Sequence, residues 1–354
     1  MIPHNKLTYG KIEENAVMRV IRSGYWAGGD EVNKLENKIK QITGRKYAIA
    51  VSSGFSALRL SLLALGIKPQ DEVIIPSYSC VALPNAVLAC GAIPVPVDIE
   101  LNTWNLDIAS IKSKLSQKTK AVVVVHSFGI KADLKAINSL GIAIIEDCAH
   151  ALGKVAPGSV YGKAGIISTG SFYATKFIGG GEGGVVMSDN GSISEFILHN
   201  RDYTDKRPSS VRMNDKLSNI HAAVSVSQLR RIGSFMRMRQ QIACLYNEAF
   251  IELQQEYPSF VIPDFIDRIW YRYIVYCKNT PASLLIDQLA LYGVASAKPV
   301  SNWLDKAHVK KFPVSCFAYN HLVSLPIYPT LSKDEIKKVI NAVKQSLTHL
   351  HHAK

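Results

Sequence analysis

The feature that most constrains the fold is an alternation, between residues 47 and 190, of short β-branched apolar runs with segments of helical periodicity. Several runs are continuous in valine and isoleucine, as expected for strands covered on both faces of a sheet. After the first run, Phe55–Leu65 is predicted to be a helix that ends at Gly66. Alternating strands and helices predict an α/β fold with a largely parallel, doubly wound sheet. The predicted strands are Tyr47–Ser52, Glu72–Ile75, Ile93–Asp98, Ala121–His126, Ala143–Glu146, Ile166–Phe172 and Gly184–Ser188.

The chain that follows this sheet predicts a second, smaller unit. Asn214–Gln241 has the pattern of one long helix or a broken pair, and later residues mix helix with short strands such as Tyr271–Cys277. Ser332–Glu335 forms a capping-box pattern ahead of an amphipathic C-terminal helix. We therefore predict a large domain of residues 1–245 and a small C-terminal domain of residues 246–354.

Net charge does not identify the partner by itself. The chain has 41 basic and 28 acidic residues, a formal charge of +13, and the basic residues are dispersed. Such a charge suits nucleic acid, but it suits an anionic small substrate or cofactor equally well. Because no DNA-binding motif accompanies it, we expect no nucleic-acid partner. The densest basic group is Arg230, Arg231, Arg237 and Arg239, on the predicted long helix.

Targeting and cysteine patterns favour a cytoplasmic protein. No run of about 18 apolar residues predicts a membrane span, and the first residues lack the apolar core of a secretory signal. The six cysteines show no CxxC spacing, so we expect neither a metal site nor a disulfide framework. Scattered cysteines with apolar neighbours usually behave as small buried hydrophobic residues.

A lysine at the end of a predicted strand is the first candidate for chemistry. Lys176 closes the run Ser171–Lys176 and precedes a glycine-rich stretch that ends at Gly184. Schiff-base chemistry needs an amine that loses its proton near neutral pH, which partial desolvation can supply. Glycines allow the backbone to approach a cofactor closely. An ordinary exposed loop lysine has the same sequence surroundings.

Two carboxylates end another predicted strand. Glu146 and Asp147 follow Ile144 and Ile145, and ligands of open α/β sheets bind beyond the carboxyl ends of strands. A carboxylate there can pair with a protonated pyridine nitrogen and strengthen a cofactor as an electron sink. The alternative is an aspartate that caps a following helix.

A serine-rich turn supplies a third candidate. The first strand runs into Ser52-Ser53-Gly54 and then a helix, and the free amides of a helix N-terminus bind anions such as phosphate. The alternative is an ordinary N-cap by Ser53.

Together these three features resemble a known family. Residues 146–150 read EDCAH and are followed about 21 residues on by SFYATK and then GEGG. In these motifs the chain resembles the DegT/DnrJ/EryC1/StrS sugar aminotransferases, which use pyridoxal 5′-phosphate (PLP). The resemblance implies the PLP-dependent transferase fold type I, with a mostly parallel seven-stranded sheet flanked by helices in the large domain and a smaller C-terminal α+β domain.

The resemblance also implies residue roles. Lys176 matches the Schiff-base lysine that shuttles the proton, and Asp147 matches the carboxylate on the pyridine nitrogen. His150 stands where the family has Gln or His near the ring oxygen. The remaining cofactor-binding positions are the phosphate turn with Gly54 and the amides of Phe55 and Ser56, the phosphate-binding Ser171, Cys80 at the ring, and Asn214.

The implied reaction is a transamination by a homodimer. Asn214 matches an asparagine that reaches the phosphate of the neighbouring subunit's cofactor, so the two active sites would be shared. An amino acid, glutamate by analogy, would convert PLP to pyridoxamine 5′-phosphate, which would aminate a nucleotide-linked keto-sugar for lipopolysaccharide or other polysaccharide synthesis.

Two positions depart from the family pattern. Phe55 replaces a threonine of the phosphate turn, and we expect the Ser56 hydroxyl or Ser171 to compensate. Cys80 stands where an aromatic residue usually covers the cofactor ring, so we expect Cys80 to be a buried packing residue and Tyr78 or His150 to cover that face.

Two other functions remain as alternatives. Some relatives are PLP-dependent sugar dehydratases, in which histidine replaces the Schiff-base lysine, and Lys176 disfavours that reaction. A non-catalytic PLP-binding regulatory protein is compatible with the changes at Phe55 and Cys80. The structural roles of His126 and Lys298 are also open: His126 ends a strand as a structural or substrate-contacting residue, and Lys298 is a candidate contact for a pyrophosphate.

Overall fold

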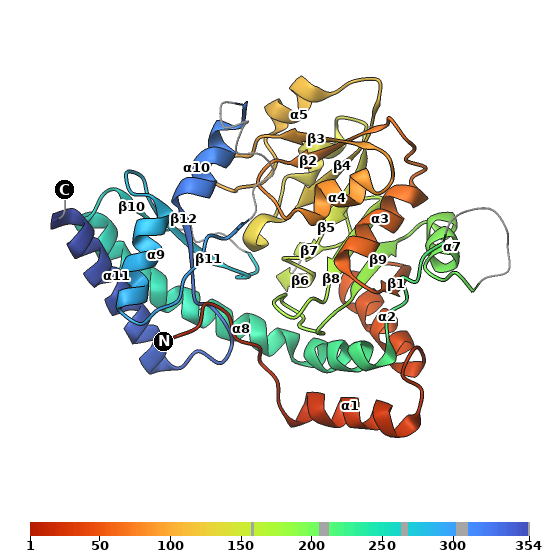
Figure 1. Ribbon diagram of the computed structural model, residues 1–354, viewed down its shortest axis with the longest axis horizontal. Coiled ribbons are helices and arrows are strands. Elements are labelled where there is room, and N and C mark those ends of the chain that lie inside the picture. Colours follow the sequence, from red (N-terminus) through yellow and green to blue (C-terminus); the bar gives the residue numbers. More distant parts are fainter. Residues whose placement is uncertain (157–158, 205–211, 263–267, 302–310, 353–354) are drawn as a thin grey trace.

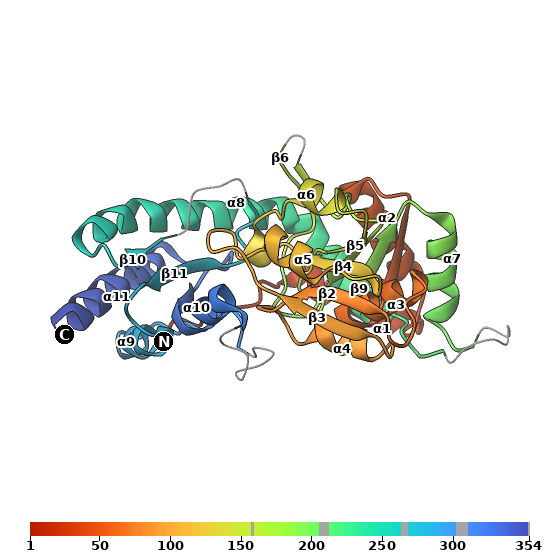
Figure 2. The same cartoon turned by 90° about the horizontal axis from the view of Figure 1, so that it is seen from above.

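The computed structural model describes residues 1–156, 159–204, 212–262, 268–301 and 311–352. The molecule is elongated, with a large sheet and its helices at one end and the C-terminal elements at the other (Figures 1 and 2). Among the described residues, no helix is long and apolar enough to cross a bilayer.

The large sheet has seven strands in the order β1-β9-β8-β5-β4-β2-β3. All neighbouring pairs are parallel except those that β9 makes with β1 and β8. The predicted α/β class and mostly parallel seven-stranded sheet are confirmed. The strands are β1 Tyr47–Val51, β2 Glu72–Pro76, β3 Ile93–Val97, β4 Thr119–Val125, β5 Ala143–Asp147, β8 Ile167–Ser171 and β9 Gly184–Ser188, and a separate hairpin consists of β6 Gly153–Ala156 and β7 Ser159–Tyr161.

Helices cover both faces of the sheet, which explains its continuous apolar runs. In β2, Val73 and Ile75 pack with α3 and α4 on one face, whereas Ile74 packs with α5 and α6 on the other. At the β1 end, α2 and α8 (Asn219–Glu256) cover one face and α3 and α7 the opposite face. The helices of this part are α1 Lys11–Ser23, α2 Asp30–Thr43, α3 Gly54–Ala64, α4 Ala82–Leu88, α5 Ile108–Lys114, the 3₁₀ turn η1 Ser127–Gly129, α6 Leu134–Asn138 and α7 Gly191–Asn200.

The C-terminal part has its own core around a three-stranded antiparallel sheet of order β10-β11-β12. The predicted capping box is present, because the Ser332 amide donates to Glu335 Oε2 and the Glu335 amide to Ser332 Oγ. Ile2 also belongs to this core, so the N-terminus joins the C-terminal part (Figure 1). The elements are β10 Phe260–Val261, β11 Tyr273–Cys277, α9 Ala282–Leu291, α10 Pro313–His321, β12 Leu322–Leu325 and α11 Lys333–His352.

The helix predicted at 214–241 begins and ends elsewhere. The single helix α8 spans Asn219–Glu256, and the Ser218 hydroxyl caps it by accepting from the His221 amide. It continues past residue 241 because Tyr246 and Phe250 are buried in the C-terminal core. α8 runs along both parts of the molecule (Figure 1). It also includes residues 245 and 246, where the sequence predicts the boundary between the two domains, and that boundary stays a prediction.

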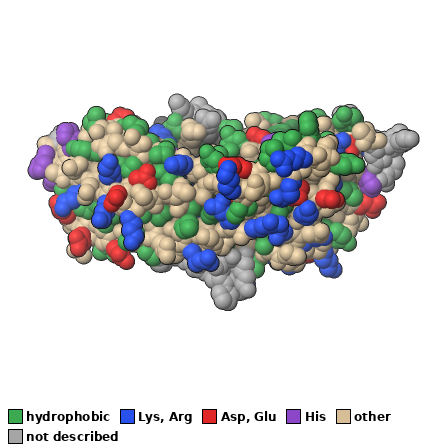
Figure 3. Space-filling view, turned by 90° about the horizontal axis from the view of Figure 1, so that it is seen from below, with side chains coloured by type: hydrophobic (Ala, Val, Ile, Leu, Met, Phe, Trp, Pro, Cys, Tyr) green, Lys and Arg blue, Asp and Glu red, His purple; other side chains and the backbone are tan. Residues whose placement is uncertain are grey.

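Lys and Arg side chains are spread over the face seen in Figure 3, with Asp and Glu side chains among them. The buried Arg239 belongs to the densest basic group of the sequence, and its Nη1 donates to the carbonyls of Trp270 and Tyr271 instead of facing solvent. This group is therefore not one continuous basic surface.

Candidate active site

A cavity of about 480 Å³ lies at the edge of the sheet where β1, β2, β4, β5 and β8 end. Residues 271–272 and 299–301, from the C-terminal part, complete its wall. Ser56 and Asn214 are not among the lining residues. The predicted site residues that line the cavity are Gly54, Phe55, Cys80, Asp147, His150, Ser171 and Lys176.

Lys176 sits in a tight turn directly after β8. Its amide donates to the Tyr173 carbonyl at 2.8 Å, and its half-buried side chain places Nζ 5.6 Å from the centre of the Tyr271 ring. The following glycines allow the chain to return to β9: Gly183 has a φ of +134°, and a Cβ there would lie 2.9 Å from Leu217. The backbone conformation thus requires a glycine at position 183 whether or not a ligand is bound.

Asp147 ends β5 and faces the cavity. Its Oδ1 accepts from the Ala149 amide at 3.0 Å and from the Thr169 hydroxyl at 3.4 Å, and no described residue bonds Oδ2. Burial raises the pKa of this carboxyl, opposed by the Ala149 amide and the charge of Lys176. Residues 148–152 form a turn instead of a helix, so helix capping does not explain this carboxylate. It is a buried acceptor that a cation in the cavity would stabilise.

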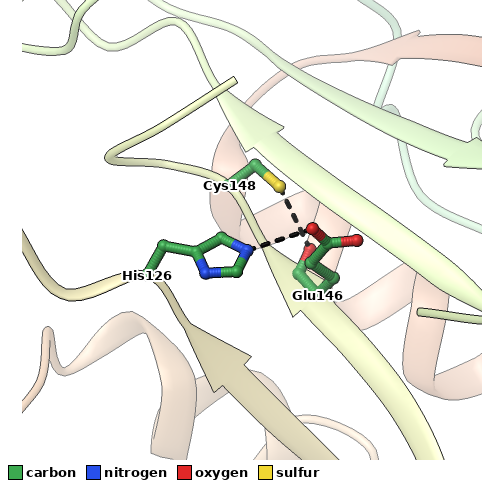
Figure 4. A group of neighbouring side chains, drawn as sticks. All are labelled: His126, Glu146 and Cys148. Carbon is green, nitrogen blue, oxygen red and sulfur yellow. Dashed lines mark hydrogen bonds and ion pairs between the residues drawn. The ribbon is translucent and has the colours of Figure 1, made fainter. Parts of the chain in front are cut away.

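Glu146 points to the opposite face of β5, toward His126 and Cys148 (Figure 4). His126 Nδ1 accepts from the Ala132 amide, so Nε2 carries the hydrogen that it donates to Glu146 at 3.0 Å. The carboxylate also accepts from the Ser168 hydroxyl and three backbone amides, those of residues 162, 164 and 165.

These three side chains lie close enough to hold a metal ion, but their donor atoms are already in use. Burial opposes ionisation of Glu146, yet the bonds from His126 and the amides of Gly162 and Gly165 bring its pKa to about 2. Burial raises the pKa of the Cys148 thiol, which therefore stays protonated. His126 is fully buried away from the cavity, so the structural alternative for this residue fits.

The N-terminus of α3 lies in the wall of the cavity. The Ser53 hydroxyl caps the helix by accepting from the Ser56 amide at 3.0 Å. Gly54 and Phe55 are the first two residues of the helix, and their amides have no partner within it. Gly54 lies against Ser171, because a Cβ at Gly54 would come within 3.0 Å of the Ser171 Cβ. Amides at a helix start and an adjacent hydroxyl suit a phosphate.

Ser56 does not take part in this cradle. Its amide is bonded to Ser53, and its hydroxyl donates to Asp215 Oδ1 at 2.7 Å. Asp215 also pairs with the buried Arg59, so Ser56 belongs to a network that joins α3 to the segment before α8. The expectation that the Ser56 hydroxyl compensates for Phe55 does not fit this arrangement.

Cys80 is exposed in the cavity wall, so the expectation of a buried packing residue is wrong. The chain leaves β2 before this position, and Tyr78, two residues earlier, is the one buried against Phe128. Of the six free cysteines, Cys90, Cys148 and Cys277 are buried as expected.

An aromatic stack that the sequence pattern does not predict lines the same cavity. His150 stacks on Tyr271 with ring centres 4.4 Å apart and on Phe128 at 6.1 Å. Burial lowers the pKa of His150, and its buried Nδ1 has no hydrogen-bond partner among the described residues. Tyr271 and the adjacent Arg272 carry no motif, so only the aromatic and basic character of Trp270–Tyr273 marks them.

Two further predicted residues lie outside the cavity. Asn214 is exposed and does not reach the cavity of its own chain. Lys298 places Nζ 3.9 Å from the centre of the Tyr319 ring, next to the lining residues 299–301.

These groups fit PLP. The cofactor has an aldehyde, a pyridine nitrogen and a phosphate, and the cavity offers an amine at Lys176, a buried carboxylate at Asp147 and a helix start at Gly54. The unpartnered Nδ1 of His150 is a further polar atom that a ligand would satisfy. When bound, PLP supplies an electrophilic carbon and an electron-withdrawing ring.

The chain is similar in sequence to known aminotransferases. The sequence profile of the DegT/DnrJ/EryC1/StrS aminotransferase family matches residues 8–344. The chain is 31% identical to dTDP-3-amino-3,6-dideoxy-alpha-D-galactopyranose transaminase of Aneurinibacillus thermoaerophilus, over 96% of each chain. It is 30% identical to GDP-perosamine synthase of Vibrio cholerae, over 97% of this chain and 98% of that one.

A solved structure shows the same fold with a cofactor. The crystal structure of NtdA from Bacillus subtilis, with bound cofactor PMP, superposes with a TM-score of 0.87 at 25% identity, over 96% of this chain and 82% of that chain. The chain therefore belongs to the DegT/DnrJ/EryC1/StrS aminotransferase family and is a PLP-dependent enzyme.

Proposed function

We propose that the protein transfers an amino group from glutamate to the keto carbon of a nucleotide-linked sugar, for the synthesis of amino-sugars and the polysaccharides that contain them. Glutamate leaves as its 2-oxo acid and the ketone becomes an amine, so the two half-reactions balance. The proposal follows the names of the relatives that act on dTDP- and GDP-linked sugars. The observation that carries it is one cavity with an amine, a buried carboxylate and a helix start.

Each residue of this cavity has a proposed task. Lys176 Nζ would hold the cofactor and would move the proton during the reaction. Asp147 would hold the pyridine nitrogen in its protonated form, because burial makes an unpaired carboxylate unfavourable there. The first amides of α3 and the Ser171 hydroxyl hold the phosphate.

The homodimer belongs to the same proposal. Asn214 is exposed and lies outside the cavity of its own chain, as a residue that serves the partner's site should. A cytoplasmic location is also proposed, since the six cysteines are free thiols, which a reducing compartment preserves.

Absorbance spectroscopy of the PLP-loaded protein tests the proposal. We expect a visible band that shifts when glutamate is added and is absent in Lys176→Ala. Lys118→Ala, which changes an exposed lysine far from the cavity, is the matched control and should behave as wild type. A protein that holds PLP through Lys176 but reacts with no amino acid would contradict the proposed transamination.

A further inference from the structure

Arg272 is a cation in the cavity wall without a carboxylate partner in the described part of the chain. It lines the cavity and also a small pocket behind it, which contains His4, Arg239 and Ser324. No described Asp or Glu pairs with Arg272, and its one side-chain hydrogen bond to a described residue joins Nη1 to His4 Nε2 at 3.0 Å. A half-buried guanidinium whose described hydrogen-bond partner is a neutral ring retains its capacity to bind an anion.

His4 holds Arg272 without neutralising it. His4 Nε2 also lies 2.9 Å from the Ser324 hydroxyl, and burial followed by the charge of Arg272 lowers the pKa of His4 to about 4. His4 is therefore neutral near pH 7, and its Nε2 lone pair can accept from Arg272. The N-terminal segment that carries His4 is anchored to the C-terminal part, because the Ile2 amide donates to the Gly293 carbonyl and the Ala295 amide donates to the Ile2 carbonyl.

The charges of the cavity leave Arg272 available. Lys176 and Asp147 are assigned to the cofactor in the proposed function, and His150 is neutral because burial lowers its pKa. The remaining carboxylate in the wall, Glu182, is exposed and does not pair with Arg272. Arg272 is thus the remaining fixed positive charge among the described lining residues.

The position of Arg272 favours a carboxylate close to the reacting nitrogen. Its Cζ lies 5.2 Å from the centre of the Tyr271 ring, and Lys176 Nζ lies 5.6 Å from the same centre. One carbon separates the amine of an amino acid from its α-carboxylate, whereas a sugar ring separates the diphosphate of a nucleotide sugar from a keto carbon. We propose that Arg272, positioned by His4, binds the α-carboxylate of the amino-acid donor; this inference rests on the proposed transamination.

Single-turnover kinetics test the inference. PLP-loaded protein is mixed with increasing glutamate, and the absorbance change gives an apparent dissociation constant and a limiting rate. We expect Arg272→Gln to raise that constant about 10- to 100-fold, the range for losing a charge-assisted bidentate bond. Arg272→Lys should raise it less, and amination of the keto-sugar by the amino form of the enzyme should be unchanged. Arg230→Gln removes the same charge from an exposed position on α8 and should have no effect.

Two further measurements separate binding from structural damage. Calorimetric titration of the PLP-loaded protein with maleate, a dicarboxylate without an amine, should show weaker binding in Arg272→Gln but not in Arg230→Gln. His4→Ala should raise the glutamate constant severalfold at an unchanged limiting rate, and His4→Gln, which keeps an acceptor, should restore it.

The outcomes separate this inference from the proposed function. Wild type that reacts with glutamate while Arg272→Gln and Arg272→Lys keep its dissociation constant would overturn the inference and leave the function intact. A defect confined to the keto-sugar half-reaction would assign Arg272 to the acceptor and overturn the inference too. Wild type that reacts with no amino acid would overturn both.

Discussion

The two faces of β5 carry adjacent carboxylates with opposite environments. Glu146 accepts from His126, a serine hydroxyl and three amides, whereas Asp147 accepts only at Oδ1, from one amide and one hydroxyl. Their pKa values move in opposite directions, down to about 2 for Glu146 and upward for Asp147. Both are buried, so the number of internal donors accounts for the difference.

In our proposal Glu146 is a structural carboxylate and Asp147 is a cofactor-binding one. Glu146 is satisfied by the protein itself and joins β5 to Ser168 of β8 and to the turn at 162–165. Asp147 Oδ2 has no hydrogen-bond partner among the described residues, and we propose that the bound cofactor supplies one. Two adjacent residues therefore predict two different phenotypes.

The largest effect is expected from Glu146→Gln. The amide nitrogen of glutamine cannot accept the hydrogen bonds that a carboxylate oxygen accepts, and donors would be left unpaired. We expect a loss of about 3–5 kcal/mol in the free energy of unfolding, as when one partner of a buried pair is removed. Denaturant titration of the cofactor-free protein measures it. A loss below about 1 kcal/mol, the size of an exposed pair, would contradict the structural role of Glu146.

Asp147→Asn is expected to act on catalysis instead. Asparagine fits the space but carries no charge to keep the pyridine nitrogen protonated, so kcat should fall by about 10²–10³-fold, as when one preorganised electrostatic group is removed. Steady-state kinetics with saturating donor and acceptor measure it, and circular dichroism checks the fold. Activity within threefold of wild type would remove Asp147 from the proposed mechanism.

The sequence predicted the positions of the strands better than it predicted the different environments of Glu146 and Asp147 on the two faces of β5. Continuous Val and Ile runs place β5 and β4 within one or two residues, because burial on both faces leaves little other choice. The resemblance to a family singled out Asp147 and Lys176, which the structure brings to one cavity.

Long-range packing explains what the sequence did not predict. The Ser56 hydroxyl is turned away from the cavity by Asp215, which lies far along the chain, so this contact does not follow from local pattern. The start of α8 at Asn219 follows instead from a local signal, the N-cap Ser218. Tyr271 and Arg272 reach the cavity from the C-terminal part, more than 90 residues after Lys176 in the chain, so no spacing rule connects them to the site.

The loss of stability at acid pH should depend on the ionisation of Glu146. A carboxyl whose pKa is lower in the folded protein contributes stability above its unfolded value, and loses it as pH falls through the folded value. For Glu146 this window runs from about 4.5 down to about 2. The free energy of unfolding of wild type should therefore decline across this range more steeply than that of Glu146→Gln. Equal slopes for the two proteins would show that other carboxyls carry the acid transition.

The smallest expected effect is that of Asp147→Asn on the stability of the cofactor-free protein. Here the substitution should stabilise the fold, whereas Glu146→Gln should destabilise it. Since burial raises the pKa of Asp147 in the folded protein, its charged form opposes folding above the unfolded pKa, and a neutral side chain of the same shape removes that penalty. Asp147→Asn should raise the Tm of the cofactor-free protein, yet reduce the further rise that saturating PLP produces, because the ligand loses its charged partner.

Asp98→Asn is the matched control for this reversal. Asp98 is also buried, but its carboxylate is satisfied by the amides of Val314 and Ser315 and by the Ser315 hydroxyl. Its substitution should lower the Tm with and without PLP by similar amounts, as a loss of internal partners does. If Asp147→Asn also lowered the Tm of the cofactor-free protein, Asp147 would be a structural carboxylate like Glu146, and the contrast between the two faces of β5 would be lost.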